Sequence, residues 1–180
     1  MNLEVDQLDI KTTFLHGELD EEIYMKQPEV FVEKGKENLV CELRKGLYGL
    51  KQASRQWYKK FKSFMLEHGF HKTQGDHCMF VKRYNEGNFF IQLLYVDHML
   101  VVGQDTKKIA SLKKALGKLF AMKDLGPAKQ SLGMHIVGDR TKNVLWLSQE
   151  NYVTKLWKRF NMSKTKSVRS ALPKNCKIEC

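Results

Sequence analysis

The chain has 180 residues, of which 42% are apolar, so it is long enough to bury a real hydrophobic core. Its apolar runs are interrupted well before they reach the length of a membrane span, which excludes a transmembrane protein and favours a soluble globular one. The net charge of +11 is uneven: residues 1–40 carry ten acidic and four basic side chains, and the remaining 140 carry ten acidic and 27 basic. This asymmetry indicates that the later part faces a polyanion, with nucleic acid as the first candidate and a solvated lysine-rich surface as the alternative.

The N-terminal quarter of the chain predicts three short strands. Residues 3–10 alternate well enough for a strand, which ends near Asp9. Residues 11–19 predict a turn or a short helix. Residues 21–31 and 37–45 then predict a pair of strands with a loop between them.

A basic amphipathic helix is predicted within residues 46–70. Apolar side chains recur on one face at nearly helical spacing, namely at Leu50, Trp57, Phe61, Phe64 and Met65. The other face is basic and carries Lys51, Arg55, Lys59, Lys60 and Lys62. Such a face, interleaved with aromatic rings, could follow a phosphate backbone, whereas the alternative is a core helix with a solvated lysine face.

Residues 89–103 predict the central hairpin of the fold, because two runs rich in β-branched and aromatic residues flank a polar interruption. Asp97 and His98 lie at the tip of the predicted turn. A carboxylate at the end of a core hairpin loses hydration unless it meets a cation or hydrogen-bond donors. Asp97 is therefore the first candidate functional residue, and the alternative is a turn aspartate that accepts a hydrogen bond from its own backbone.

Three further elements surround this hairpin. Residues 77–83 predict a strand before it. Residues 105–120 predict a strongly amphipathic helix after it, with lysines on the face opposite to the apolar one. Residues 121–127 predict a short extended segment that ends at a Gly-Pro pair.

The C-terminal part predicts a second hairpin and a last helix. Its strands are expected within residues 130–140 and 143–147. Ser148 is expected to cap a helix over residues 149–160. Residues 163–180 are polar and basic, and we expect them to form a flexible tail.

Together these elements predict an α+β fold, in which two helices cover one side of a mixed or antiparallel sheet. In a split βαβ arrangement the end of the first strand can lie beside the central hairpin, which would make Asp9 and Asp97 neighbours. Carboxylate oxygens are ligands that Mg²⁺ prefers. Two such ions, roughly 3.5–4 Å apart, stabilise an in-line phosphoryl transfer. Two aspartates this far apart in sequence are easy to find in any chain, so the pattern alone is weak.

Five long stretches, in the same order, resemble the reverse transcriptase of copia-type retrotransposons, and they cover nearly the whole chain. The stretches are QLDIKTTFLHGELDEEIYMKQPEVF, NLVCELRKGLYGLKQASRQWY, LLYVDHMLVVG, FAMKDLGPAKQSLGMHI and LSQENYVTKLWKRFNM. The resemblance implies an RNA-directed DNA polymerase domain. It implies a polymerase palm with a ferredoxin-like split βαβ sheet and two covering helices over residues 1–146, the start of a thumb helix over residues 147–162, and a basic tail over residues 163–180.

The resemblance also implies roles for individual residues. Asp9 and Asp97 match metal-binding aspartates of the catalytic centre. Phe14 matches the bulky residue that excludes a ribose 2′-hydroxyl, and Gln52 lies in the segment that contacts the template and the incoming nucleotide. Core packing and a helix surface are the alternatives for these two. Lys123 follows the second palm helix and is assigned to nucleotide binding. The basic helix makes Lys51, Arg55 and Trp57 candidate nucleic-acid contacts, and the resemblance adds Gly133 and Met134, which match the primer-grip strand.

The turn departs from the family pattern, because it reads YVDH and His98 stands where the family has its second aspartate. A neutral imidazole removes one negative charge and replaces oxygen by nitrogen, which suits zinc or nickel better than magnesium. A loss of ~4 kcal/mol of transition-state stabilisation would slow the reaction about a thousandfold. We therefore expect that polymerase activity is lost or vestigial and that Mg²⁺ or Mn²⁺ binds weakly.

The chain begins just before Asp9, so we expect the family's fingers to be largely missing and the chain to be a truncated, decayed copy. The expected partners are an RNA or DNA primer–template and a dNTP, with no membrane. Four scattered cysteines favour an intracellular, cytoplasmic location, with a virus-like particle or the nucleus as alternatives. A non-catalytic nucleic-acid-binding module and a remnant without function are the alternative interpretations, and the oligomeric state stays open.

Overall fold

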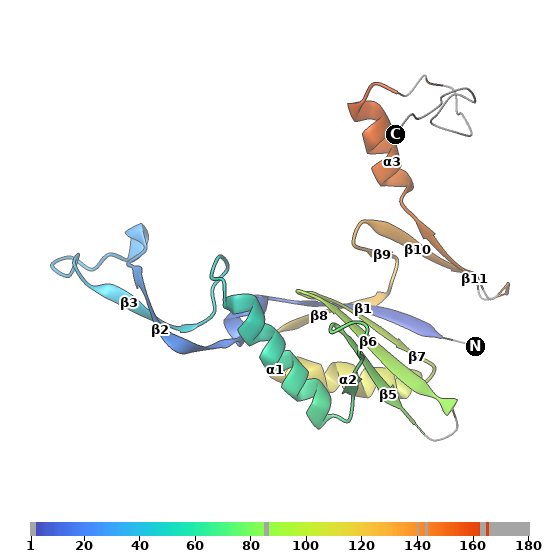
Figure 1. Cartoon of the computed structure of the whole chain (residues 1–180), viewed down its shortest axis with the longest axis horizontal. Coiled ribbons are helices and arrows are strands. Elements are labelled where there is room, and N and C mark those ends of the chain that lie inside the picture. The colour runs from blue at the N-terminus through green and yellow to red at the C-terminus, as the bar shows by residue number, and fades with distance from the viewer. Residues whose placement is uncertain (1–2, 85–86, 140, 143, 163–164, 166–180) are drawn as a thin grey trace, which may run out of the picture. The chain divides into compact units, whose positions relative to one another are not determined.

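The computed structural model of the chain divides into two compact units, which comprise residues 1–128 and 129–180. In the part of the chain that the structure describes, the first unit contains a six-stranded sheet, two α-helices and a separate hairpin, and the second contains three short strands and one α-helix (Figure 1). The structure describes residues 3–84, 87–139, 141–142, 144–162 and 165.

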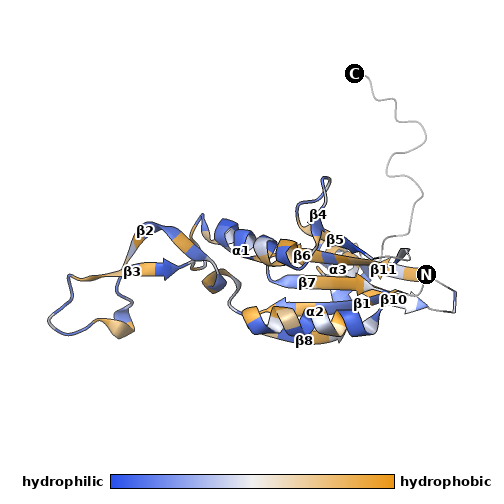
Figure 2. Cartoon of the chain, turned by 90° about the horizontal axis from the view of Figure 1, so that it is seen from below, coloured by the Kyte–Doolittle hydropathy of each residue, from blue (hydrophilic) through white to orange (hydrophobic). Residues whose placement is uncertain are grey.

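The sheet of the first unit has the strand order β4-β5-β6-β7-β1-β8, and each neighbouring pair is antiparallel. Its central strands β6 and β7 are the apolar runs of the sequence and are mostly orange in Figure 2. The predicted central hairpin and the predicted α+β fold are therefore confirmed. The strands are β1 (Glu4–Ile10), β4 (His71–Lys72), β5 (Met79–Arg83), β6 (Phe89–Tyr95), β7 (His98–Gly103) and β8 (Met122–Pro127).

Helices α1 (Ala53–Glu67) and α2 (Thr106–Leu119) contribute to the same hydrophobic core as the strands and cover one face of the sheet. Asp105 begins α2, because its carboxylate accepts hydrogen bonds from two backbone N–H groups of the first turn. Helix α1 lies within the predicted residues 46–70, but Leu50, which the sequence places on its apolar face, precedes its first turn. Gly49, with φ 98°, lies in a left-handed turn before it, a conformation that glycine adopts at little cost.

A separate two-stranded hairpin follows the first strand, and it confirms the strand pair predicted there. Its strands are β2 (Glu18–Lys26) and β3 (Val40–Lys45). The 3₁₀ turn η1 (Thr13–His16) connects β1 to β2, and a second one, η2 (Glu29–Phe31), lies in the hairpin loop. The turn or short helix predicted for residues 11–19 is therefore present.

The second unit pairs three strands in the order β11-β10-β9 and ends in helix α3 (Glu150–Arg159). The strands are β9 (Gln130–Ser131), β10 (Met134–Asp139) and β11 (Val144–Ser148). The Ser148 hydroxyl accepts a hydrogen bond from the Glu150 N–H at 3.3 Å, although Gln149 occupies the capping position. The predicted basic tail, apart from residue 165, lies outside the described residues.

Within the part of the chain that the structure describes, every helix is too short or too polar to cross a lipid bilayer.

Candidate functional site

The pairing of β1 with β7 brings Asp9 and Asp97 together, as the sequence predicts. Asp9 lies opposite His98, the first residue of β7, and Asp97 lies in the turn just before it. The backbone N–H of Ile10 donates to the Asp97 carbonyl at 2.9 Å, which ties the end of β1 to this turn. His98 pairs with Tyr95 in the β6–β7 ladder, so it belongs to the strand rather than to the tip of the turn.

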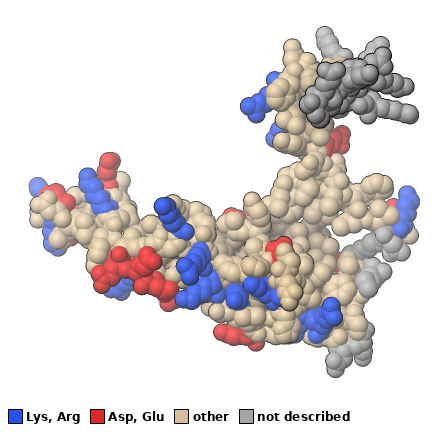
Figure 3. Space-filling model, viewed as in Figure 1, with Lys and Arg blue, Asp and Glu red and all other residues tan. Residues whose placement is uncertain are grey.

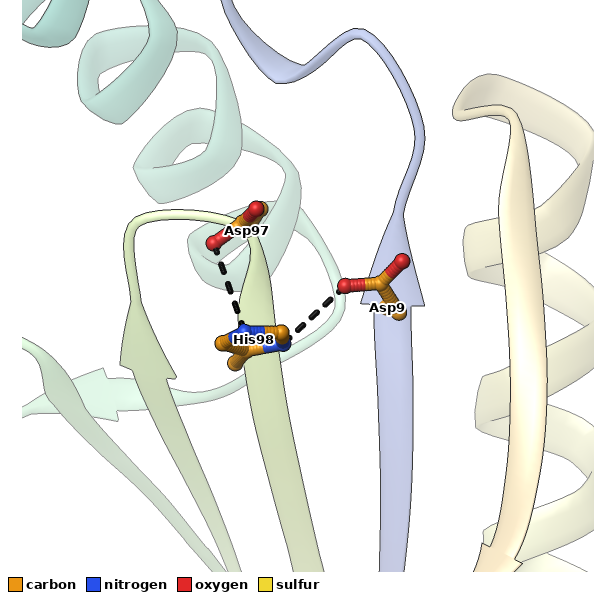
Figure 4. Close-up of side chains that lie close together, drawn as sticks. All are labelled: Asp9, Asp97 and His98. Atoms are coloured by element: carbon orange, nitrogen blue, oxygen red, sulfur yellow. Dashed lines mark ion pairs between the residues drawn. The ribbon is translucent and has the colours of Figure 1, made fainter. Parts of the chain in front are cut away.

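The imidazole of His98 lies between the two carboxylates (Figure 4). Its Nδ1 atom is 3.0 Å from Oδ1 of Asp9, and its Nε2 atom is 3.9 Å from Oδ1 of Asp97. One ligand atom from each of the three residues lies within 4.8 Å of the others. The side chains of Asp9, Asp97 and His98 are 30%, 38% and 46% exposed, so solvent and small ions reach them.

The turn that carries Asp97 is held from the hydrophobic core. Val96 has φ 57°, a left-handed conformation that is costly for a β-branched residue. The indole N–H of Trp57 donates to the Val96 carbonyl at 2.9 Å, and the Trp57 ring is only 2% exposed. The predicted nucleic-acid contact of Trp57 is therefore corrected, because the buried ring leaves no open face on which a base could stack.

Asp9 lies on the face of the sheet opposite to α1 and α2, which we call the Asp9 face. Its neighbours Leu8 and Ile10 are buried in the helix-covered core, and successive side chains of a strand point to opposite faces. Strand β8 places Lys123 directly opposite Asp9, so this exposed lysine lies on the same face. The strand register therefore places Lys123, a third predicted site residue, beside Asp9.

Phe14 and Gln52 lie in other surroundings. Phe14, in η1, is half-buried against the core, and its ring centroid is 4.5 Å from that of Tyr48. The side-chain amide of Gln52 donates to Glu21 at 3.2 Å. Core packing and a polar helix surface, the alternatives considered for these residues, describe their present contacts.

The basic face of α1 is partly neutralised by the chain's own acidic strand β2, a contact that the sequence analysis missed (Figure 3). Lys59 pairs with Asp20 at 3.2 Å, and Lys60 lies 3.6 Å from Glu18. The hydrogen bond from Gln56, followed by that from Lys59, lowers the pKa of Asp20 below its usual value. The signal in the sequence was the acidic run of residues 18–22 upstream of a basic helix. Arg55 is exposed on the same helix, and Lys51 is exposed in the turn that precedes it.

Gly133 and Met134 belong to the second unit. Gly133 has φ 79° in the tight turn between β9 and β10, where the left-handed backbone favours glycine. Met134 is the first residue of β10 and pairs with Ser131.

The donor set of the site suits one divalent cation better than a pair of Mg²⁺ ions. Mg²⁺ requires near-octahedral coordination by oxygen, and two ions in one site need carboxylates that reach both. Here Asp9 and Asp97 supply oxygen, but the third side chain, His98, supplies nitrogen. The residues present therefore do not fit a two-magnesium centre.

Comparison with known proteins identifies the family. The family model described as reverse transcriptase (RNA-dependent DNA polymerase) matches residues 1–174. The chain is 57% identical over 178 residues to a retrovirus-related Pol polyprotein from transposon TNT 1-94 of Nicotiana tabacum, which covers 99% of this chain and 13% of the polyprotein. No solved structure matches the chain.

Two further relatives agree with this match. The Pol polyprotein from transposon RE1 of Arabidopsis thaliana is 36% identical over 174 residues, which is 97% of this chain and 12% of the polyprotein. A putative transposon Ty5-1 protein of Saccharomyces cerevisiae is 35% identical over 148 residues, which is 82% of this chain and 47% of that protein. The chain thus spans about an eighth of the plant polyproteins that it matches. These matches confirm the resemblance to copia-type retrotransposons, and the chain belongs to the reverse transcriptase family.

Proposed function

We propose that this chain supplies the polymerase palm over residues 1–146 and the start of the thumb over residues 147–162, and that it binds an RNA or DNA primer–template. The strand order supports a ferredoxin-like split βαβ palm. Strands β8, β1, β7 and β6 are adjacent in that order, with α1 between β1 and β6 in the chain and α2 between β7 and β8. Strands β2 to β5 are then additions to this framework.

The convergence of Asp9 and Asp97 is the observation that carries the proposal. These side chains come from strands far apart in the sequence, yet they meet at one end of the β1–β7 pair. They are partly exposed, as a site that meets a nucleic acid must be. Because the chain belongs to the reverse transcriptase family, we assign this position to primer extension, which requires acidic side chains.

The remaining site residues follow as parts of the same proposal. Lys123, in register with Asp9, is assigned to the triphosphate of a dNTP. Phe14 is assigned to the sugar of the incoming nucleotide and Gln52 to the template, which requires Gln52 to leave Glu21 when nucleic acid binds. Gly133 and Met134 are assigned to the primer strand. An intracellular location stays a prediction.

We further propose that nucleotidyl transfer is lost or vestigial in this chain. The imidazole of His98 lies 3.0 Å from Asp9 and supplies no carboxylate oxygen. A donor set that does not fit two Mg²⁺ ions leaves the developing charge of the reaction less stabilised. A deficit of ~4 kcal/mol corresponds to a rate about a thousandfold lower.

A non-catalytic nucleic-acid-binding module is the second candidate, and His98 together with the net charge of +11 favours it. The two candidates differ in one measurable respect. The first retains a trace of extension that depends on Asp97, whereas the second binds nucleic acid without any extension. A remnant without function would do neither.

The test uses the full 180-residue chain with a fluorescently labelled DNA primer on an RNA template. We expect binding that weakens steeply between 50 and 200 mM salt, because lysine and arginine release counterions from roughly one phosphate each. We also expect little or no primer extension with Mg²⁺ or Mn²⁺. Absence of binding at low salt would refute the palm proposal. Ready extension by the unmodified chain that Asp97→Ala abolishes would refute the loss of activity.

A matched pair of variants locates the nucleic-acid surface. Replacing Lys51 and Arg55 by glutamine should lower the slope of log K against log salt by about 2, since the slope is close to 0.9 per phosphate contact. The control replaces Lys34 and Lys36, in the loop of the β2–β3 hairpin, which removes the same charge. Equal effects of both pairs would mean that binding follows net charge alone.

A further inference from the structure

We propose that Asp9, Asp97 and His98 together bind one Zn²⁺ ion in preference to Mg²⁺. The inference rests on the proposed function for the location of the centre, but it concerns metal choice and requires no nucleotidyl transfer. Two carboxylates and one imidazole are the side chains involved.

The distances allow a single ion to be shared by the three side chains. All three ligand atoms lie within 4.8 Å of one another, and the pair from His98 and Asp9 is already 3.0 Å apart. A tetrahedral ion with ligand distances of about 2.0–2.2 Å separates neighbouring ligand atoms by roughly 3.3–3.6 Å. Small rotations of these partly exposed side chains are sufficient to reach that spacing.

The ligand types decide between the metals. Imidazole nitrogen suits Zn²⁺, Cu²⁺, Ni²⁺ and Fe²⁺, whereas Mg²⁺ prefers six oxygen ligands and gives up its water reluctantly. Three protein ligands also match the number found in catalytic zinc sites, where the remaining position is left to water. His98 thus turns a site that oxygen alone would serve into a mixed nitrogen–oxygen site.

Each ring nitrogen of His98 faces a carboxylate, at 3.0 Å from Asp9 and 3.9 Å from Asp97. Nδ1 is therefore the nitrogen placed to share an ion with Asp9. The Asp97 carboxylate, at 3.9 Å, is beyond hydrogen-bond distance from the ring and is free to turn toward the ion.

The backbone holds two of the ligands in place before any ion binds. The Ile10 N–H donates to the Asp97 carbonyl, and the Trp57 indole donates to the Val96 carbonyl in the same turn. His98 is fixed by its ladder pairs with Asp9 and Tyr95. Preorganisation of this kind reduces the loss of conformational freedom on binding.

The experiment titrates the nucleic-acid-free chain with Zn²⁺ and with Mg²⁺ by calorimetry, in a variant with all four cysteines changed to serine so that thiolates do not compete. We expect Zn²⁺ to bind at least about 100-fold more tightly than Mg²⁺. Equal affinities for the two ions would overturn the proposal.

Ring signals of ¹⁵N-labelled histidine identify the ligand, and the other five histidines serve as internal controls. Zn²⁺ should shift the His98 signals first, and Asp9→Asn and Asp97→Asn should each weaken binding about tenfold or more. Unchanged Zn²⁺ affinity in His98→Gln would contradict the proposal. If His98→Gln does not fold, unchanged affinity in Asp9→Asn contradicts it equally.

The variant His98→Asp replaces the nitrogen ligand by an oxygen ligand at the same position. It restores a carboxylate at this position, and we expect the preference for Zn²⁺ over Mg²⁺ to fall about tenfold or more. An unchanged preference would place the zinc ligands elsewhere. Because these titrations contain no nucleic acid, their failure leaves the primer–template result standing, and failure of primer–template binding leaves the metal result standing.

Discussion

The two faces of the six-stranded sheet in the first unit serve different purposes, although their residues alternate along the same strands. On the helix-covered face Leu8 and Val101 are fully buried among the apolar side chains of α1 and α2. On the Asp9 face Asp9 and His98 remain partly exposed. Successive side chains of a strand point to opposite faces, so a core residue and a site residue can be direct neighbours in the sequence. The Asp9 face can therefore change its ligands without disturbing the core.

The largest effect is expected at Leu8, the neighbour of Asp9. It is 0% exposed, so Leu8→Ala removes buried methyl groups and leaves a cavity between β1 and the covering helices. We expect a loss of about 2–5 kcal/mol in the free energy of unfolding, measured by urea denaturation. A loss below about 1 kcal/mol would mean that the covered face is not the core that the burial indicates.

A smaller effect is expected from adding a methyl group to the covered face. Gly103 pairs with Phe90, and a Cβ atom on Gly103 would lie 2.7 Å from the Phe90 ring. Gly103→Ala should therefore cost about 1–3 kcal/mol through overpacking. Gly75→Ala is the control, since its Cβ would meet nothing within 4 Å. Similar losses in both variants would assign the effect to the backbone rather than to the packing.

Lys113 is expected to give a pH-dependent effect. It lies 2.6 Å from Asp6 on β1 and 2.9 Å from Asp124 on β8, and so joins α2 to both strands. Burial alone would raise the pKa of Asp124, but the hydrogen bonds from Lys113 and from the Gly126 N–H, together with the Lys113 charge, outweigh it, so the pKa lies below its ordinary value of 3.8. The folded state then binds fewer protons, and this stabilisation is present above pH 3.8 and is lost as the pH falls through the lowered pKa.

Lys113→Met should accordingly lower the free energy of unfolding by about 1–2 kcal/mol near pH 7. The loss is no larger because Asp124 is half exposed and solvent screens its charge. The difference from the unmodified chain should shrink as the pH is lowered through 4 toward 2. Denaturant titrations across this range measure it. A constant difference at all pH values would indicate lost packing of the lysine stem instead.

Trp57 tests whether the helix-covered core supports the turn that carries Asp97. Trp57→Phe keeps an aromatic ring in the core but removes the N–H that donates to the Val96 carbonyl. We expect a loss of about 1 kcal/mol in stability. Zn²⁺ affinity should fall as well, because Val96 precedes Asp97 in the turn. Loss of stability with unchanged metal affinity would show that the turn needs no such support.

Much of the first unit could be predicted from local patterns. The alternation of residues 3–10 and the apolar runs of residues 89–103 gave β1, β6 and β7, because periodicity reports which side of a strand is buried. The proximity of Asp9 and Asp97 followed from the expected strand order. The family resemblance rested on long motifs and agrees with the family match.

Contacts that depend on tertiary placement could not be predicted. Trp57 carries the same apolar and polar groups whether it stacks on a base or supports a turn, and only the packing against Phe61 and Phe120 distinguishes the two. The pairing of Lys59 with Asp20 likewise joins residues 39 positions apart. Charge patterns predict that α1 is basic, but not that an acidic strand of the same chain meets it.

The smallest effect on stability is expected at Asp9, one residue from Leu8. Asp9→Asn keeps the shape of the side chain and an oxygen that accepts from His98, and the site is partly exposed. The free energy of unfolding should change by less than about 0.5 kcal/mol. The same substitution should remove most of the metal affinity, because it replaces a charged ligand by a neutral one. Denaturation and calorimetry on both variants would then show metal affinity lost with stability kept in Asp9→Asn, and stability lost in Leu8→Ala. A large loss of stability in Asp9→Asn would mean that the Asp9 face also supports the fold, and that the two faces are not independent.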